Sequence, residues 1–206
     1  VGIPLPGVDI KIGAEDEILV KYGGVMKGYY KNEEETAKVF TEDGYFRTGD
    51  AGRIDENGNL YIVDRIKDLM KTSNGKYIAP QTIEIPLQSH PEISQAMVIA
   101  EGKPYVSAVI VPDFETLIEK YQEFKNYVSL TIEEKKKLLE SPFIKEKFEK
   151  IVADIQKEFA SYEKIKKFKL LPEEFTIEKG EITPTLKIKR RVVLEKLNSL
   201  IEGMYA

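Results

Sequence analysis

The sequence predicts an α+β protein in which a β-rich segment, residues 1–65, precedes an α+β domain over residues 66–206. Three observations support this division. Short alternating apolar runs, separated by glycine and acidic turns, fill the first 64 residues. A polar stretch containing a glycine then follows, over residues 65–80, and is typical of a connection between domains. After it, strand-like and helix-like patterns are mixed, as in α+β proteins.

The β-rich segment is expected to be a meander of short strands. Val8, Ile10 and Ile12 alternate with polar residues, so they share one face of a strand. Asn57-Gly58 is the signal of a tight hairpin, because an Asn-Gly turn accepts positive φ angles. The expected elements are strands at residues 7–13 and 17–23, a short helix at 31–40, and strands at 51–54 and 60–64.

The second domain is expected to mix both element types. Pro80 fits the first turn of a helix that Pro86 should shorten or kink. Thr131 and Glu134 have the spacing of a capping box. The remaining expected elements are two strands at 93–113 joined by a turn at 101–104, a helix at 114–124, a helix after Ser141-Pro142 with Ile144, Phe148, Ile151, Val152, Ile155 and Phe159 on one face, a strand at 165–172, a loop at 176–187 and a terminal helix at 190–205.

Composition excludes several kinds of site. The 206 residues contain no cysteine and one histidine, so neither a thiolate nucleophile nor a cysteine-ligated zinc site can form. The net charge of −4 argues against a general nucleic-acid binder. No apolar run approaches the ~18 residues that span a bilayer, and we expect a cytoplasmic protein. The chain begins with Val1 inside a strand-like pattern, which indicates a piece of a longer protein.

Asp50 and Arg65 are the first candidate site residues. Asp50 follows Thr48-Gly49 in an expected turn, where its carboxylate could accept two hydrogen bonds from a vicinal diol such as ribose. A guanidinium at residue 65 supplies several donors for ribose or phosphate oxygens. If the hairpin between them folds back, the two side chains meet at one end of the sheet. On the local pattern alone, a surface turn with a surface salt bridge is the favoured interpretation, because single Asp and Arg residues are usual in turns.

The segment "KTSNGKYIAP", Lys71–Pro80, is the second candidate. Gly75 permits a positive φ, and Ser73 and Asn74 offer a hydroxyl and an amide. Exposed backbone amides here could line a narrow channel for a polar chain. The competing interpretation is an ordinary left-handed turn before a helix.

The third candidate is the basic loop over residues 180–193. Lys187 on such a loop is a good point charge for a phosphate or a developing oxyanion, and Lys189 is an alternative. The competing interpretations are a solvated basic helix start and a nuclear-localisation or nucleic-acid patch formed by Lys187, Lys189, Arg190 and Arg191. His90 is expected to end a helix, because one histidine alone makes neither a triad nor a metal site.

The order and spacing of these motifs resemble the C-terminal half of an adenylate-forming enzyme, over essentially the whole chain. The resemblance rests on four stretches: Tyr45–Asp50, Asp64–Asp68, the Gly75 loop ending in Ile83-Glu84, and the late Lys187. "VMKGYYKNEEETAKVF" and Ile182–Lys187 look most like the long-chain fatty acyl-CoA synthetase branch.

The resemblance implies a two-step reaction that uses ATP, Mg²⁺ and coenzyme A, and it implies roles for nine residues. A fatty acid would attack ATP to give acyl-AMP, and coenzyme A would then displace AMP. Residues 1–65 would be the barrel-like last subdomain of a large N-terminal domain, and residues 66–206 the mobile C-terminal domain. The implied roles are Lys187 for catalysis, Asp50, Arg65 and Tyr61 for ATP or AMP, Lys67 for the hinge, and Ser73, Asn74, Gly75 and Lys76 for coenzyme A.

Some features depart from the family pattern. Leu186 precedes Lys187, where many relatives have glycine, and Pro86 replaces a helix-compatible residue. The phosphate loop and acyl pocket belong to the N-terminal domain, so the piece alone should not form acyl-AMP. A stand-alone nucleotide-binding or protein-interaction module is the alternative, and a peptide-synthetase adenylation domain is a third. Expected partners are the three substrates and the N-terminal domain, without nucleic acid. Membrane association and oligomeric state are left open.

Overall fold

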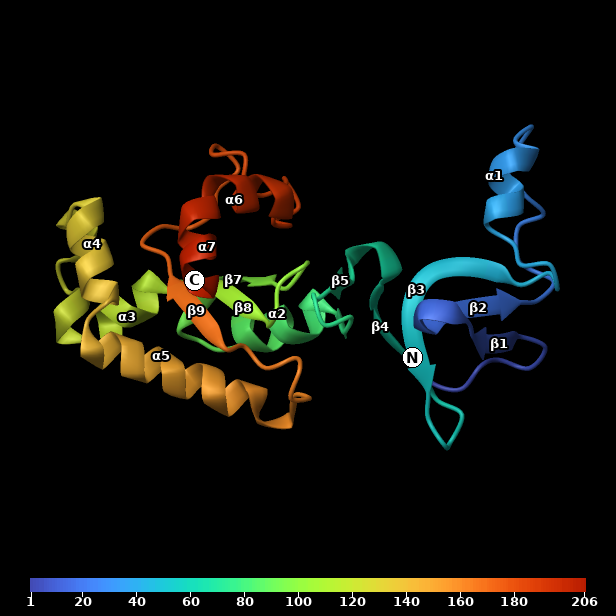
Figure 1. The fold of residues 1–206 in the computed structure, drawn as a ribbon, viewed down its shortest axis with the longest axis horizontal. Helices are drawn as coiled ribbons and strands as arrows, with labels where there is room; N and C mark the ends of the chain where they lie inside the picture. Colours follow the sequence, from blue (N-terminus) through green and yellow to red (C-terminus); the bar gives the residue numbers. More distant parts are fainter. The chain divides into compact units, whose positions relative to one another are not determined.

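The computed structural model describes residues 1–206, and the chain divides into two compact units, Val1–Leu69 and Met70–Ala206. The division falls after Leu69, whereas the sequence pattern places it after residue 65. Helices and strands are combined as the α+β prediction requires, so that prediction is confirmed (Figure 1).

The first unit contains an antiparallel sheet with the strand order β1-β2-β3-β4 (Figure 1). Its strands are β1 (Asp9–Ile12), β2 (Glu17–Lys21), β3 (Phe46–Ile54) and β4 (Leu60–Arg65), with the short helices η1 (Ala14–Asp16), α1 (Glu33–Lys38) and η2 (Ile66–Asp68). Strand β3 is the longest and is visibly curved in Figure 1. It includes residues 48–50, where the sequence pattern indicated a turn.

The hairpin between β3 and β4 forms as the Asn-Gly signal predicts. Gly58 has a φ of 79°, in the left-handed region that glycine favours. The Asp55 carboxylate accepts the backbone N–H groups of Asn57 and Asn59 at 2.9 and 2.8 Å. These hydrogen bonds hold the turn, and they also keep the pKa of Asp55 below its usual value.

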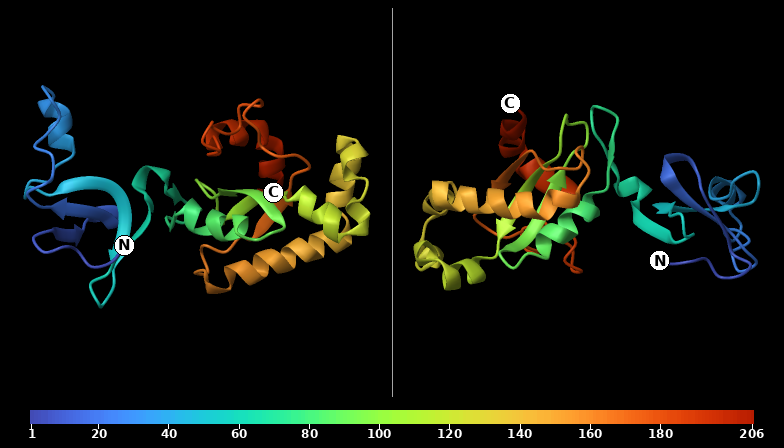
Figure 2. Two further views of the ribbon diagram at one scale, coloured as in Figure 1. Left: turned by 180° about the vertical axis from the view of Figure 1, so that it is seen from behind. Right: turned by 90° about the horizontal axis from the view of Figure 1, so that it is seen from below.

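The second unit is built on a mixed sheet with the order β7-β8-β9. Strands β7 (Ile93–Ile99) and β8 (Ser107–Pro112) are antiparallel, and β9 (Lys167–Leu170) is parallel to β8. Alternate residues of β7 and β8 belong to two cores. One core includes buried residues of α2 (Pro80–Gln88) and α5 (Pro142–Ile155), and the other includes those of α6 (Arg190–Lys196) and α7 (Asn198–Tyr205). Figures 1 and 2 show these helix pairs on the two sides of the sheet. Because both faces are covered, β7 and β8 are apolar almost throughout.

The helices of the second unit are α2 (Pro80–Gln88), α3 (Phe114–Lys120), α4 (Ile132–Leu139), α5 (Pro142–Ile155), α6 (Arg190–Lys196) and α7 (Asn198–Tyr205). The capping box predicted at Thr131 and Glu134 is present. Helix α5 buries Ile144, Phe148, Ile151 and Val152, as its periodicity predicts. No helix in the chain combines the length and the apolar character that crossing a membrane requires.

Four details of the sequence-based prediction are wrong. The terminal helix is two helices, because the backbone leaves helical geometry at Leu197, which allows Val193 of α6 and Met204 of α7 both to be buried in the core. The expected loop at residues 65–80 contains a small sheet of β5 (Met70–Lys71) and β6 (Tyr77–Ile78). Helix α3 ends at Lys120, and a separate 3-10 turn follows. Helix α5 ends before Phe159.

A buried carboxylate joins several elements of the second unit. Glu92 lies just before β7, with Lys120 and Lys147 within 3.2 Å of its oxygens and a hydrogen bond from the Tyr121 hydroxyl at 2.9 Å. Burial raises the pKa of this carboxyl, but the hydrogen bonds from Tyr121 and Lys120 and the positive charge of Lys147 outweigh that effect. The pKa of Glu92 therefore lies below its usual value, and the carboxylate is ionised in the folded unit at neutral pH.

Candidate functional site

Asp50 and Arg65 meet on neighbouring strands of the first unit. They are cross-strand partners of β3 and β4, and Asp50 Oδ1 lies 2.8 Å from Arg65 Nε. The expectation that the hairpin brings them together is confirmed. The expectation that Asp50 sits in a turn is wrong, because β3 continues through it and pairs it with β4.

A buried carboxylate shapes the strand just before Asp50. Glu17, which is 7% exposed, accepts the Gly49 N–H at 3.2 Å and pairs with Arg47 at 2.9 Å. Gly49 has a φ of 70°, so an alanine there would be strained. The Thr48 hydroxyl donates to the Ile18 carbonyl at 2.8 Å and accepts the Asp50 N–H at 3.1 Å. The Thr-Gly-Asp sequence is thus held against β2 and directs Asp50 toward Arg65.

Sequence reasoning missed Glu17. Its signal is an acidic residue that begins the otherwise apolar run of β2, at a position where strand pairing is irregular between Glu17 and Leu19. Only the fold shows that this carboxylate faces a glycine 32 residues later.

The Asp50–Arg65 pair remains accessible to a ligand. The Asp50 side chain is 25% exposed and that of Arg65 is 56% exposed. The Arg65 backbone N–H donates to the buried Asp64 carboxylate at 2.7 Å. This hydrogen bond fixes the backbone from which the Arg65 side chain extends. A carboxylate and a guanidinium side by side offer two acceptor oxygens and several N–H donors, the set that a ribose or another vicinal diol would use.

Tyr61 does not join this pair. It lies four residues from Arg65, about 13 Å along the strand. Its ring contacts the Arg53 guanidinium at 4.3 Å, and its hydroxyl donates to Asp55 at 3.2 Å. Both partners belong to the hairpin end of β3 and β4. Nucleotide binding by Tyr61 stays a prediction.

Lys67 lies in the 3-10 turn η2, three residues before the second unit begins. The turn is closed by the Leu69 N–H, which donates to the carbonyls of Arg65 and Ile66 at 3.1 and 3.2 Å. The Lys67 side chain is exposed. A single tight turn at this place suits a hinge, and that role stays a prediction.

The loop over residues 72–76 is a closed hairpin between β5 and β6. Gly75 has the positive φ that its sequence predicts, at 77°. The N–H groups of Ser73 and Gly75 donate to the carbonyls of Lys103 and Thr72 at 3.0 and 2.9 Å, and that of Lys76 donates to the Thr72 hydroxyl. The expectation of exposed backbone amides is therefore wrong for these three residues, because the hairpin docks on the β7–β8 turn.

Side chains, rather than amides, are what this hairpin presents to solvent. Ser73, Asn74 and Lys76 are exposed, and the Asn74 amide reaches the Pro104 carbonyl at 3.1 Å. Their contact with coenzyme A stays a prediction.

Lys187 lies in a tight turn of the second unit. Ile182 and Ile188 pair as an isolated bridge, and the Thr183 N–H donates to the Lys187 carbonyl at 2.8 Å. The Thr183 hydroxyl accepts the Lys187 N–H at 3.0 Å. Leu186 has a φ of 62°, which is unusual for a residue with a side chain. The turn leaves the Lys187 side chain exposed. Its catalytic role stays a prediction.

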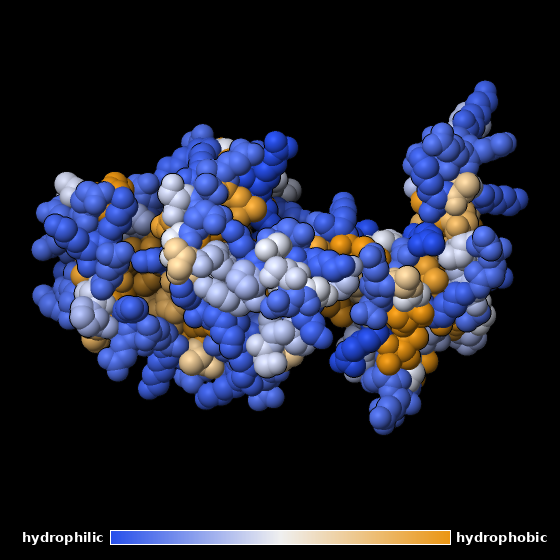
Figure 3. Space-filling view, viewed as in Figure 1, coloured by the Kyte–Doolittle hydropathy of each residue, from blue (hydrophilic) through white to orange (hydrophobic).

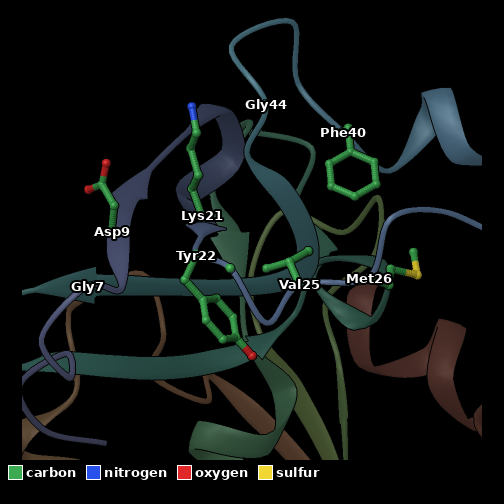
Figure 4. Close-up of a pocket in the computed structure, with 9 residues that line it drawn as sticks. Gly7, Asp9, Lys21, Tyr22, Val25, Met26, Phe40 and Gly44 are labelled. Atoms are coloured by element: carbon green, nitrogen blue, oxygen red, sulfur yellow. The ribbon is translucent and has the colours of Figure 1, made fainter.

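Two surface hollows lie away from these residues. A hollow of about 550 Å³ in the first unit is lined by Asp9, Lys21, Tyr22 and apolar neighbours, as Figure 4 shows. A second, of about 720 Å³, lies in the other unit between α4, β9 and α7, where Figure 3 shows apolar surface rimmed by hydrophilic residues. Neither contains a residue predicted for the site. No three His, Cys, Asp or Glu side chains come together as a metal site would require.

Residues 67–206 match the family model described as the AMP-binding enzyme C-terminal domain. The match covers most of the chain, so the chain belongs to this family.

Individual relatives point to one branch. The chain is 39% identical over 205 residues to long-chain-fatty-acid–CoA ligase FadD15 of Mycobacterium tuberculosis, covering 100% of this chain and 34% of that protein. It is 36% identical over 197 residues to long-chain-fatty-acid–CoA ligase 5 of Mus musculus, covering 94% of this chain and 28% of that protein. The chain therefore spans about a third of the length of these relatives.

A solved structure shares the fold. The A domain of the carboxylic acid reductase from Segniliparus rugosus, solved with AMP and a co-purified carboxylic acid, has a TM-score of 0.67 and 27% identity. The similarity covers 97% of this chain and 32% of that one.

Proposed function

We propose that this chain is the C-terminal part of an AMP-forming acyl-CoA ligase that acts on long-chain fatty acids. The whole-length similarity to long-chain-fatty-acid–CoA ligases carries the proposal. The solvent-accessible Asp50–Arg65 pair supports it, because it offers the donors and acceptors that a nucleotide ribose needs.

In the first half-reaction, the fatty acid carboxylate attacks the α-phosphorus of Mg-ATP. A P–O bond to the acyl oxygen forms, and the bond to the leaving pyrophosphate breaks. Asp50 accepts the ribose hydroxyls and Arg65 donates to ribose or phosphate oxygens. Lys187 supplies a positive charge where the carboxylate and the α-phosphate crowd together, and such a charge stabilises the transition state by several kcal/mol (about 3 kcal/mol for one donor in comparable sites).

In the second half-reaction, the coenzyme A thiol, as thiolate, attacks the acyl carbon and AMP leaves with the electron pair of the broken C–O bond. The second unit rotates about Lys67 between the two steps, so that the exposed side chains of Ser73, Asn74 and Lys76 replace Lys187 near the substrates. Such a movement is driven by the difference in ligand affinity between the two arrangements.

The proposal is tested with the full-length protein that contains this chain. We expect ATP–pyrophosphate exchange that depends on a long-chain fatty acid, and thioester formation when coenzyme A is added. The 206-residue chain alone should catalyse neither step. Absence of exchange with fatty acids of every length would reject the proposal, and nucleotide binding without exchange would favour the stand-alone binding module.

A further inference from the structure

We propose that Glu84 and Arg190 form a positioning clamp that fixes the base of the Lys187 turn for the first half-reaction. The inference rests on the proposed function of Lys187. It assigns a role in that reaction to two residues that do not themselves touch the substrates.

The acidic partner of the clamp, Glu84, is a buried carboxylate with both oxygens paired. Glu84 of α2 is 9% exposed and accepts the backbone N–H of Val98 in β7 at 2.7 Å. The Arg190 guanidinium pairs with both of its oxygens, with Nη1 at 2.9 Å from Oε1 and Nη2 at 3.0 Å from Oε2. The same guanidinium donates to the Val98 carbonyl at 2.8 Å. A bidentate pair of this kind fixes orientation as well as distance.

One member of the clamp, Arg190, lies close to Lys187 in the sequence. Arg190 begins α6 and is three residues after Lys187. The partners of Arg190 belong to α2 and β7, which form the core of the unit. The pair thus ties the end of the turn to elements that contribute to the buried core of the second unit.

A second anchor holds the other end of the turn. Glu181 accepts the Lys189 N–H at its carbonyl, 2.7 Å away, and pairs through Oε1 with Lys196 at 3.0 Å. With the Ile182–Ile188 bridge, both ends of the turn are held, and its tip with Lys187 remains exposed.

A clamp matters here because lysine is a flexible point charge. Its four-carbon stem gives little orientation of its own, so the position of the ammonium depends on where the backbone holds it. In catalysis, a displacement of about 1 Å can lower the rate by roughly 100-fold. Glu84 and Arg190 therefore act on the reaction through Lys187.

The neighbouring arginine provides a matched control. Arg191 has the same chemistry one residue later, but its side chain is 92% exposed and pairs with Glu195 one turn along its own helix. Arg191→Gln removes a surface pair, whereas Arg190→Gln removes the clamp.

The test uses the full-length protein, with Arg190→Gln, Arg190→Lys and Arg191→Gln assayed for each half-reaction. We expect Arg190→Gln to lower kcat for acyl-AMP formation by about 10- to 100-fold. Thioester formation from pre-made acyl-AMP should stay within about twofold, because Lys187 does not serve that step. Arg190→Lys keeps the charge but loses the fork, and should lie in between. Arg191→Gln should match the wild type.

A second measurement on the 206-residue chain separates this inference from the proposed function. Amide exchange by NMR should show that Arg190→Gln reduces protection of the Leu186 and Lys187 N–H groups, which donate to Thr183. Arg191→Gln should leave that protection unchanged. Unchanged protection in Arg190→Gln, or an equal loss of both half-reactions, would overturn the clamp. A wild type that makes no acyl-AMP would instead reject the proposed function. If Arg190→Gln does not fold, Arg190→Lys decides by the same two readouts.

Discussion

Replacing Asp50 by asparagine tests the nucleotide-binding role of the first unit. Asn keeps the shape of the side chain and removes its charge, so one charge-assisted hydrogen bond to ribose is lost. Such a bond contributes about 1.5–3 kcal/mol, which corresponds to roughly 10- to 150-fold weaker ATP binding. The cost to folding should be small, because Arg65, the partner of Asp50, is 56% exposed, and exposed pairs contribute at most about 1 kcal/mol.

The assay is the KM for ATP in pyrophosphate exchange by the full-length protein, with thermal unfolding measured alongside. Asp55→Asn is the control, because Asp55 holds the neighbouring hairpin through Asn57 and Asn59. We expect that control to lower the unfolding midpoint and leave the KM for ATP unchanged. If Asp50→Asn behaves like the control, with lower stability and unaltered ATP binding, the pair is a structural salt bridge and the reasoning fails.

Four further predictions concern single positions. Lys187→Ala should lower acyl-AMP formation by roughly 100-fold or more and spare thioester formation from acyl-AMP; normal pyrophosphate exchange would remove it from the mechanism. Gly52→Ala places a Cβ 2.5 Å from a carbonyl of β4, so urea unfolding should show a loss of about 1–3 kcal/mol, whereas Gly23→Ala meets nothing within 4 Å and should be close to neutral. Leu186→Gly should stabilise the second unit by about 0.5–1 kcal/mol in the same assay. Glycine removes the strain of about 1–2 kcal/mol that a side chain causes in the left-handed region, and part of this gain is offset because glycine loses more conformational entropy on folding. A loss of stability would contradict this prediction. The pKa of Glu92 is lowered in the folded protein, so its contribution to the free energy of unfolding is present above its unfolded pKa of about 4.5 and is lost as the pH falls through the folded value. Glu92→Gln should therefore reduce the pH dependence of the free energy of unfolding in that range, and an unchanged pH dependence would contradict the assignment.

Local signals in the sequence predicted the local structure well. Asn57-Gly58, the Thr131 capping box and the apolar face of α5 each depend on residues within a few positions, and each forms as predicted. The pairing of Asp50 with Arg65 was predictable for the same reason, because only one hairpin separates them. Features that depend on residues close together in the sequence can therefore be predicted without a structure.

Pairs that are distant in sequence could not be predicted. Glu17 meets Gly49 across 32 residues, and Glu84 meets Arg190 across 106. Nothing in the composition of α2 marks Glu84 as buried, and an arginine beside a basic loop is more simply explained as a solvated charge. In the fold, the charge of Arg190 is paired with Glu84 inside the unit. The short run of basic residues is therefore less suited to binding nucleic acid than its sequence indicates.

Leu186 has a strained backbone conformation and directly precedes Lys187, the predicted catalytic lysine. The turn is closed by Thr183 and by the Ile182–Ile188 bridge, and this closure places Leu186 at a φ of 62°, where glycine is the residue without strain. The leucine side chain is 72% exposed, so burial within this chain does not offset the strain. Strained residues persist where function requires the conformation, and this one directly precedes Lys187. If its exposed side chain contributes to the first half-reaction, Leu186→Gly will gain stability and lose acyl-AMP formation together; if it does not, the glycine variant will be more stable and equally active.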